Sequence, residues 1–293
     1  MMDAKHPALI INPAAGPVWR RRKAARLIER LRELFPGLSV HPTARTGDAE
    51  RFARELSGGG CDLILAAGGD GTYNEVINGL RESSVPLAVL PMGTGNSLVR
   101  ELGLPVNPFR AAEAIRRGVA RPVYPGELDR RLFILMVGAG LDADIIRQVP
   151  PAKKHLGMLA YVLAGIARLF SYPYSEIVFS VDGREYRGTT GIIAKAGCYG
   201  GPFKIAPDAA LDRPDLVLCL FKGRGAIRYL IYSLGVMAGL HRRMRGVEFI
   251  RGQTVEILGA VPIQVDGDPI GIGPARLTVA SKPLYLVYPA TSS

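Results

Sequence analysis

The sequence predicts an α/β protein: a parallel α/β domain followed by a mostly antiparallel second domain. Through roughly the first 120 residues, apolar strand-like runs alternate with runs of helical periodicity. From about Arg121 the pattern changes to short β-rich runs separated by glycine, proline and charged residues. The chain has 293 residues, of which 48% are hydrophobic, and this length allows about two domains with separate cores.

The first domain is expected to span residues 1–122. Residues 7–13 (PALIINP) have the pattern of a short buried strand, and residues 19–35 (WRRRKAARLIERLRELF) that of an amphipathic helix ended by Pro36. The next expected elements are a helix at 48–56, a strand at 62–67, a helix from about Asn74 to Leu80 and a strand at 86–91. In such a domain, ligands bind at the carboxyl ends of the parallel strands.

The second domain is expected to span residues 123–293. Its strand-like runs lie at 176–181, 191–196, 216–221, 255–258 and 262–267. The last run, about 283–289 (PLYLVYP), is also strand-like and can return to the first domain. Two apolar segments, His155–Phe170 and Ile227–Leu240, are shorter than the roughly 20 residues that span a bilayer, so buried or half-buried helices are expected there.

Charge and cysteine content narrow the class of protein. Lysine and arginine outnumber aspartate and glutamate by 37 to 26, and the net charge of +11 favours an anionic partner. Basic residues flank both apolar segments, as on a surface that docks on an anionic bilayer. Cys61, Cys198 and Cys219 are widely spaced, which indicates neither a disulfide framework nor a zinc site. The first residues show no basic-then-apolar leader, so a cytoplasmic location is expected.

Two glycine loops follow consecutive predicted strands. Gly68–Thr72 (GGDGT) and Pro91–Ser97 (PMGTGNS) each stand between an apolar strand and a helix. Glycine lets a backbone approach a phosphate closely, and the amides at a helix start point toward it. Two such loops at neighbouring strand ends therefore predict a phosphate site.

Other motifs are incomplete or absent. Val137–Ala143 (VGAGLDA) fits the GxGxxA dinucleotide pattern, but the stretch 153–170 that follows has no carboxylate, so this segment is interpreted as a turn in the second domain. The sequence contains no GxxxxGK[ST], HExxH or GxSxG motif. A Walker phosphate loop, zinc hydrolysis and serine esterase chemistry therefore lack local support.

Carboxylates carry the remaining chemistry. Asp70 lies within the first glycine loop, and a carboxylate beside a triphosphate is repelled unless a cation such as Mg²⁺ bridges the two. Asp266 and Asp268 stand two residues apart in VDGDP, where either can accept the proton of an attacking hydroxyl. Taken alone, the DGD stretch is typical of a hairpin turn.

These residues resemble a known family, the diacylglycerol kinase catalytic domain, shared by bacterial lipid kinases, sphingosine kinases and ceramide kinases and more distantly by NAD kinases. The resemblance covers nearly the whole chain in family order. Its motifs are INPAAG from Ile11, TGDA from Thr46, GGDGTYNEVINGL from Gly68, LPMGTGNSLVRELGLP from Leu90, LFILMVGAGLDADI from Leu132, GGPFKIAPDA from Gly200 and QVDGDP from Gln264. The resemblance implies an ATP-dependent lipid kinase with MgATP in a cleft, an amino-terminal nucleotide domain and a carboxyl-terminal β-sandwich that presents the lipid.

The resemblance also assigns roles by position. It implies nucleotide contacts from Asn12, Thr46, Gly68, Gly69, Asp70, Gly71, Thr72, Asn74, Gly93, Thr94 and Asn96. Asp268 stands at the proton-accepting glutamate of the family's DGE motif, one methylene shorter, and Asp266 at the aspartate of that motif. With Asp70, which would hold magnesium through ATP, these are the expected catalytic residues.

The chain departs from the family at two places. Ser97 stands where members often have an aspartate. Arg213 and Pro214 stand where an Asp-Gly pair binds a structural magnesium, so only Asp212 or Asp215, after a shift of one residue, can take that place. A homologue that binds nucleotide or lipid without catalysis therefore remains an alternative. An NAD kinase is a second alternative, because NAD kinases share the GGDGT motif.

The expected partners follow from the resemblance and from the charge. They are a lipid substrate and the anionic surface of a membrane, to which the protein would bind peripherally. No nucleic acid is expected, because the basic runs lack a recognisable binding module. A homodimer stays open.

Overall fold

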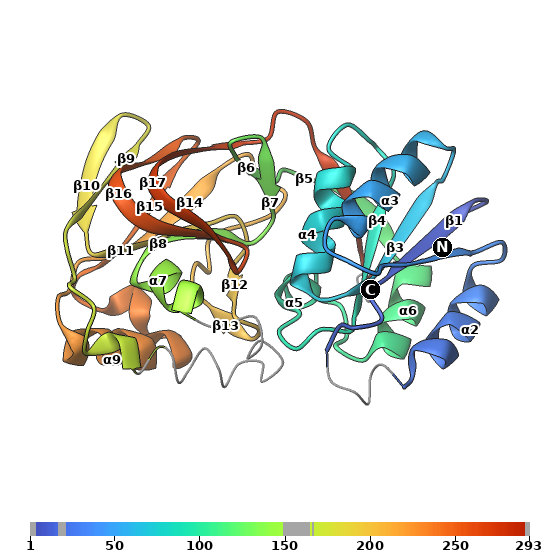
Figure 1. The fold of residues 1–293 in the computed structure, drawn as a ribbon, viewed down its shortest axis with the longest axis horizontal. Helices are drawn as coiled ribbons and strands as arrows, with labels where there is room; N and C mark the ends of the chain where they lie inside the picture. The colour runs from blue at the N-terminus through green and yellow to red at the C-terminus, as the bar shows by residue number, and fades with distance from the viewer. Residues whose placement is uncertain (1–3, 17–21, 149–164, 166, 291–293) are drawn as a thin grey trace. The chain divides into compact units, whose positions relative to one another are not determined.

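A six-stranded sheet forms the centre of the first part of the computed structural model (Figure 1). The structure describes residues 4–16, 22–148, 165 and 167–290. The chain divides into two compact units: Met1–Tyr124 with Ser281–Ser293, and Pro125–Ala280. The strands of the first unit run in the order β2-β1-β3-β4-β18-β5, with bounds β1 (Pro7–Ile11), β2 (Ser39–Pro42), β3 (Leu63–Gly68), β4 (Leu87–Pro91), β5 (Val119–Val123) and β18 (Leu284–Tyr288).

The central strands β1, β3 and β4 are parallel neighbours, and each is buried along its whole length. A parallel sheet covered by helices buries both faces, which explains their continuous apolar sequences. β18 pairs parallel with β4 and antiparallel with β5, so the last strand of the chain lies in this sheet. The helices described in this unit are α2 (Ala24–Leu34), α3 (Asp48–Gly58), α4 (Asp70–Gly79), α5 (Ser97–Glu101) and α6 (Pro108–Arg116).

The start of α4 differs from the sequence prediction. The helix was expected from about Asn74, but it begins at Asp70, directly after an extended Gly69. Gly71 at the second helical position has low helix propensity, which hid this first turn. The residues Asp70, Gly71 and Thr72 therefore form the first turn of a helix and not a free loop.

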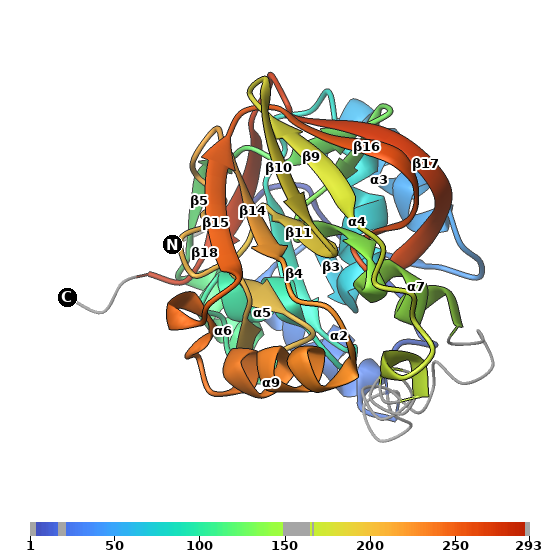
Figure 2. The same ribbon diagram turned by 90° about the vertical axis from the view of Figure 1, so that its left-hand side faces the viewer.

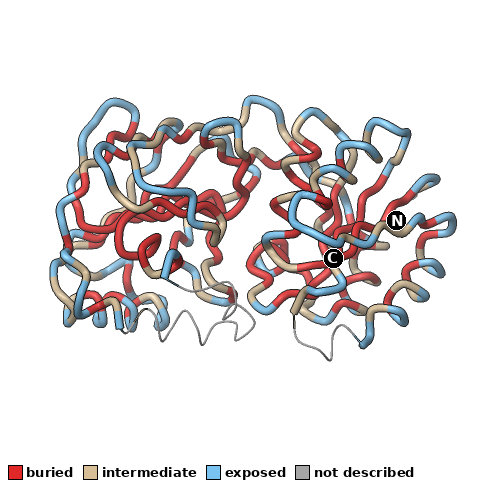
Figure 3. The backbone as a smooth tube through the Cα atoms, in the orientation of Figure 1, coloured by how far each residue is buried: buried red, intermediate tan, exposed pale blue. Residues whose placement is uncertain are grey.

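The second unit is built on a ten-stranded sheet in which all described pairs are antiparallel. Its strands are β6 (Gly126–Leu128), β7 (Arg131–Phe133), β8 (Met136–Gly140), β9 (Ile177–Val181), β10 (Arg184–Gly188), β11 (Thr190–Ala194), β14 (Leu216–Phe221), β15 (Val247–Gly252), β16 (Val255–Val265) and β17 (Asp268–Val279). A separate hairpin joins β12 (Cys198–Tyr199) and β13 (Phe203–Lys204). The curved sheet encloses a core that includes Phe133, Phe179 and Leu218, and Figure 3 shows this buried interior in red.

The glycine-rich stretch at 137–143 is a junction between a strand and a helix. β8 ends at Gly140 and α7 (Leu141–Gln148) begins at the next residue, so the interpretation as a simple turn was wrong. The strands beside β8 are antiparallel, so the junction does not lie in the βαβ unit that a dinucleotide fingerprint requires.

The apolar segment Ile227–Leu240 forms helix α9 (Ala226–Met237), followed by a short 3-10 helix, η2 (His241–Arg243). Figure 2 shows α9 along one end of the sheet of the second unit. Most of the other segment, His155–Phe170, lies outside the described residues. Among the described helices, none combines the length and the hydropathy needed to cross a bilayer. Cys61, Cys198 and Cys219 are free thiols.

Candidate functional site

The loops after β1, β3 and β4 converge at the carboxyl edge of the first sheet. A Cβ atom on Gly16 would lie 1.8 Å from the Met92 carbonyl oxygen, and one on Gly93 would lie 2.6 Å from the Cα atom of Gly69. The amides of Met92 and Gly93 both donate to the Gly68 carbonyl at 2.8 Å. Only glycines allow this backbone-to-backbone packing, which brings together the predicted phosphate loops.

The carboxylate of Asp70 holds the start of the second loop's helix. Its Oδ2 accepts from the Ser97 amide and its Oδ1 from the Leu98 amide, both at 3.0 Å. Burial raises the pKa of Asp70, and these bonds oppose that shift. The sequence argument that this charge demands a cation was therefore incomplete, because the first amides of α5 already stabilise it.

Other predicted nucleotide residues lie around this junction. Asn12 Nδ2 donates to Thr72 Oγ1 at 3.3 Å, which ties the β1 loop to the first turn of α4. Asn96 has a left-handed backbone (φ 50°) and donates from Nδ2 to the Gly93 carbonyl at 2.8 Å. Its Oδ1 is buried and finds no hydrogen-bond partner among the residues that the structure describes. Thr94 is exposed on the second loop.

Two further predicted residues behave differently. Gly71 is exposed, and a Cβ atom there would meet nothing within 4 Å, so its lack of a side chain leaves open space beside the loops. Asn74 is buried one turn further into α4, and its Oδ1 accepts from Asn78 Nδ2 at 3.2 Å. The side chain of Asn74 therefore has an internal partner within the helix.

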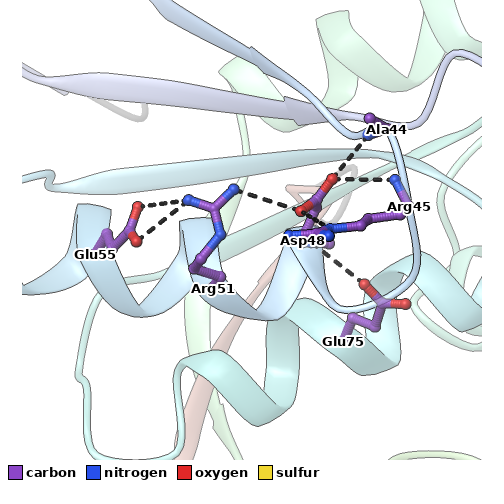
Figure 4. A network of polar contacts seen from close by, with 7 residues as sticks. Ala44, Arg45, Asp48, Arg51, Glu55 and Glu75 are labelled. Atoms are coloured by element: carbon purple, nitrogen blue, oxygen red, sulfur yellow. Dashed lines mark hydrogen bonds and ion pairs between the residues drawn. The ribbon is translucent and has the colours of Figure 1, made fainter.

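Thr46 is exposed on the loop before α3. Asp48 at the start of that helix accepts from the amides of Ala44 and Arg45 at 2.9 and 3.0 Å (Figure 4), and these bonds lower its pKa. The Ala49 amide donates to Glu75 Oε2 at 3.3 Å. Because Glu75 belongs to α4, this bond fixes the start of α3, just after the Thr46 loop, to the helix that carries the first glycine motif.

In the second unit, the DGD stretch forms the turn of the β16–β17 hairpin. Asp266 and Gly267 both have positive φ angles, 48° and 90°. The Asp266 carboxylate accepts from the amides of three consecutive residues, Ile134, Leu135 and Met136, at 2.9, 3.0 and 2.8 Å. Asp266 therefore anchors the turn to the segment between β7 and β8.

Asp268, the first residue of β17, is far less constrained. Its side chain is 49% exposed and forms an ion pair with Arg131 Nη2 at 3.1 Å. A carboxylate that remains open to solvent can reach a substrate hydroxyl. Of the two aspartates in this turn, Asp268 is the stronger candidate for a proton acceptor.

A lysine ammonium group is bound to the loop around residues 210–213, where the resemblance places a structural magnesium. Lys195 is fully buried, and its Nζ donates to the carbonyl oxygens of Ala210 and Arg213, both at 2.6 Å. Asp212 is exposed, and Asp215 pairs with Arg213 and Arg251. Asp212 is therefore not proposed as a metal ligand.

The second unit also contains an apolar pocket of about 210 Å³ that sequence reasoning missed. Its lining comes from Leu141, Asp142, Ile145, Thr190, Ile192, Tyr199, Phe203, Ile205, Phe221, Tyr229, Tyr232, Ser233, Val236 and Met237. Within this wall, Asp142 accepts from the Tyr199 hydroxyl and, at 2.8 Å, from Gln264 Nε2. Burial raises the pKa of Asp142, against the effect of these two bonds. No local motif predicts the pocket, because its lining residues are spread over almost a hundred positions of the sequence (141–237).

The comparisons with known proteins cover both units. Residues 6–128 match the family model of the diacylglycerol kinase catalytic domain, and residues 135–288 match the YegS C-terminal NAD kinase beta sandwich-like domain. A protein named diacylglycerol kinase from Bacillus subtilis (strain 168) is 30% identical over 293 residues, with 97% of each chain covered. The "Probable lipid kinase YegS-like" of Chromohalobacter salexigens is 32% identical over 270 residues, which covers 89% of this chain and 86% of that protein.

A solved structure agrees with the fold. The crystal structure of a diacylglycerol kinase from Bacillus anthracis str. Sterne superposes with a TM-score of 0.81 at 23% identity and covers 99% of both chains. The predicted fold class, a parallel α/β domain with an antiparallel β-sandwich domain, is confirmed.

Proposed function

Because this chain belongs to the diacylglycerol kinase family and is therefore a lipid kinase, we propose that it transfers the γ-phosphate of ATP to a hydroxyl of diacylglycerol or a related lipid at a membrane surface. The observation that carries this proposal is the packing of three loops at one sheet edge without intervening side chains, at Gly16, Gly69 and Gly93. Closely packed glycine loops at the carboxyl ends of parallel strands, beside the first turn of α4, suit a polyphosphate.

The residues of these loops fit a nucleotide. The exposed Gly71 and Thr94 leave room beside the loops for a ligand. The buried Asn96 Oδ1 lacks a hydrogen-bond partner among the described residues, so it can accept a hydrogen bond from a bound nucleotide. Asn12 and Thr46 stand on the loops after the neighbouring strands β1 and β2. When bound, Mg²⁺ would neutralise the triphosphate charge beside Asp70.

Asp268 is the proposed proton acceptor. The lipid hydroxyl oxygen forms a bond to the γ-phosphorus, the bond from that phosphorus to the β–γ bridging oxygen breaks, and ADP leaves. The hydroxyl proton passes to the Asp268 carboxylate, whose direction Arg131 fixes by its ion pair. Asp266 does not take part, because its oxygens hold three backbone amides.

The pocket of the second unit is the proposed site for an acyl chain. Apolar and aromatic side chains dominate its lining, with a few polar groups such as Asp142, Thr190 and Tyr199 that can orient a ligand. One face of helix α9 contributes Ser233, Val236 and Met237 to this lining.

Another face of α9 suits a bilayer surface. Its exposed apolar side chains recur at helical spacing, and they are Ile227, Leu230, Ile231 and Leu234, with Leu240 just beyond the helix. Met237 is also exposed and lines the edge of the pocket. The basic residues Arg242 and Arg243 follow in η2. An exposed apolar stripe beside positive charge favours peripheral binding to anionic lipid.

A vesicle assay tests the membrane part of the proposal. Leu234→Glu should reduce sedimentation with phosphatidylglycerol-containing vesicles by about 10-fold, since it puts a charge into the apolar stripe. Leu258→Glu is the matched control, because Leu258 is an exposed leucine on β16, outside α9. Equal binding by the two variants would contradict docking through α9.

A labelling assay tests the reaction itself. Purified protein is incubated with γ-labelled ATP, Mg²⁺ and a total lipid extract, and the labelled product is identified by mass. The proposal predicts a phosphorylated lipid. Label in NAD, supplied in a parallel reaction, would support the NAD kinase alternative, and tight ATP binding without any labelled product would support a non-catalytic binding protein.

A further inference from the structure

Three polar side chains, the half-buried Tyr199 and the buried Asp142 and Gln264, connect the wall of the apolar pocket to the turn that precedes Asp268. The Tyr199 hydroxyl donates to Asp142 Oδ1, and Gln264 Nε2 donates to Asp142 Oδ2 at 2.8 Å. At its other end, Gln264 accepts through Oε1 from the Gly267 amide at 2.8 Å. The line of hydrogen bonds therefore runs from a pocket residue to the middle of the DGD turn.

The fold reserves space for this line. A Cβ atom on Gly138 would lie 1.9 Å from Asp142 Oδ2 and 2.7 Å from Gln264 Nε2, so only glycine at position 138 leaves room for the two groups to meet. Gln264 is 1% exposed and Asp142 is 8% exposed. Polar side chains buried this deeply are costly unless they are paired, and here both ends of the Gln264 amide have partners.

The polarity of the line fixes the orientation of each group. The Gly267 amide can only donate, so Gln264 must turn its oxygen toward the DGD turn and its NH₂ group toward Asp142. Asp142 must then present an oxygen to Gln264. The Gly267 amide and the Asp142 carboxylate therefore favour the same orientation of Gln264, which holds the residue directly before Asp268.

We propose that Gln264 is a positioning residue for Asp268 and that Asp142, in the wall of the pocket, fixes Gln264 in its working orientation. Asp266 anchors one side of the same turn to residues 134–136, and Gln264 anchors the other. A ligand in the pocket that contacts Tyr199 or Asp142 acts on the same line of hydrogen bonds. The catalytic part of this inference rests on the proposed function, in which Asp268 accepts the proton.

Exchanging the amide and the carboxylate between positions 264 and 142 tests the proposal. In Gln264→Glu, a second carboxylate faces Asp142, so the orienting contact is lost. A double variant combines Gln264→Glu with Asp142→Asn. In it, the introduced carboxylate can still accept from the Gly267 amide, while the introduced asparagine donates its amide to that carboxylate and accepts through its oxygen from Tyr199. The double variant therefore restores every bond of the line with the charge moved from one side chain to the other.

Steady-state kinetics give the first readout. Gln264→Glu should lower kcat by about 10- to 100-fold with KM for ATP and lipid within about 3-fold, because a misplaced catalytic group affects the chemical step. The double variant should recover kcat to within about 3-fold of the wild type. If the double variant is as slow as, or slower than, the single variant, or if Gln264→Glu keeps full kcat, the positioning role is overturned.

Hydrogen exchange of the Gly267 amide gives a readout that does not depend on activity. The amide should exchange faster in Gln264→Glu than in the wild type and regain its protection in the double variant. Equal protection in all three proteins would overturn the inference. If the wild type phosphorylates no lipid, the proposed function fails, and this exchange measurement still decides whether Gln264 and Asp142 hold the turn.

Discussion

The candidate sites of the two units differ in the groups that form them. In the first unit the site is mainly backbone: glycines at positions 16, 69 and 93 pack against one another's main chains, and a single carboxylate, Asp70, holds the start of α5. In the second unit the site is mainly side chains: an apolar pocket with the hydrogen-bonded line of Tyr199, Asp142 and Gln264 in its wall. The first site should therefore be sensitive to added volume, and the second to altered polarity and charge.

Removing the anchor of the DGD turn should have the largest effect on stability. Asp266→Ala leaves the amides of Ile134, Leu135 and Met136 without their acceptor, which should cost about 4 kcal/mol of unfolding free energy. Urea denaturation measures this loss. The control is Asp268→Ala, whose half-exposed side chain pairs with the partly exposed Arg131, so a similar loss in both variants would contradict the division of roles.

Added volume in the first unit should come next. Gly93→Ala places a Cβ atom 2.6 Å from the Cα atom of Gly69 and should cost about 3 kcal/mol. Gly71→Ala is the matched control: its Cβ atom meets nothing within 4 Å, so the variant should gain about 0.5 kcal/mol from helix propensity.

The same control variant tests the position of the nucleotide. Because the open space at Gly71 is proposed to receive ATP, Gly71→Ala should be at least as stable as the wild type yet bind ATP more weakly. Calorimetric titration with ATP measures this. Unchanged ATP affinity in Gly71→Ala would place the phosphates elsewhere.

The buried ammonium of the second unit should have a smaller effect. Lys195→Met removes the buried donor to the carbonyls of Ala210 and Arg213 and should cost about 2 kcal/mol, since two charge-assisted hydrogen bonds are lost. Thermal unfolding with and without Mg²⁺ measures the change. If Mg²⁺ raises the Tm of the wild type without nucleotide, the loop binds a metal despite Lys195.

The smallest effect should be a change in pH dependence. Burial raises the pKa of Asp142 above its ordinary value of 3.8, so the folded state binds this proton more tightly than the unfolded state. The stabilisation is complete below that value and is lost as the pH rises through the folded pKa. Asp142→Asn should therefore lose less stability than the wild type as the pH rises above about 4. Parallel slopes of Tm against pH would contradict this.

The contrast between the units also explains what the sequence could predict. The strand pattern and the two glycine motifs are local, so the α/β class and the meeting of the two glycine loops followed from short stretches. The partners of Asp70 are 27 and 28 residues away, and those of Asp266 are 130 to 132 residues away, so neither structural role was visible. The pocket was hidden for the same reason.

Two errors within the sequence reasoning have local causes. The early start of α4 was missed because Gly71 lowers the helical signal of the first turn. The stretch around Gly140 was interpreted as a turn because of its glycines, although a strand ends and a helix begins there. In both cases the glycine lies inside or at the end of a regular element, so its presence did not indicate a loop.

The central claim is that this lipid kinase uses Asp268, and not its neighbour Asp266, to accept the proton of the lipid hydroxyl. The most direct test is the rate of phosphate transfer from γ-labelled MgATP to lipid by Asp268→Ala, measured with its thermal unfolding. We predict a loss of about 100-fold or more in kcat with a Tm close to that of the wild type. A rate within about 3-fold of the wild type, in a folded protein, would contradict the account.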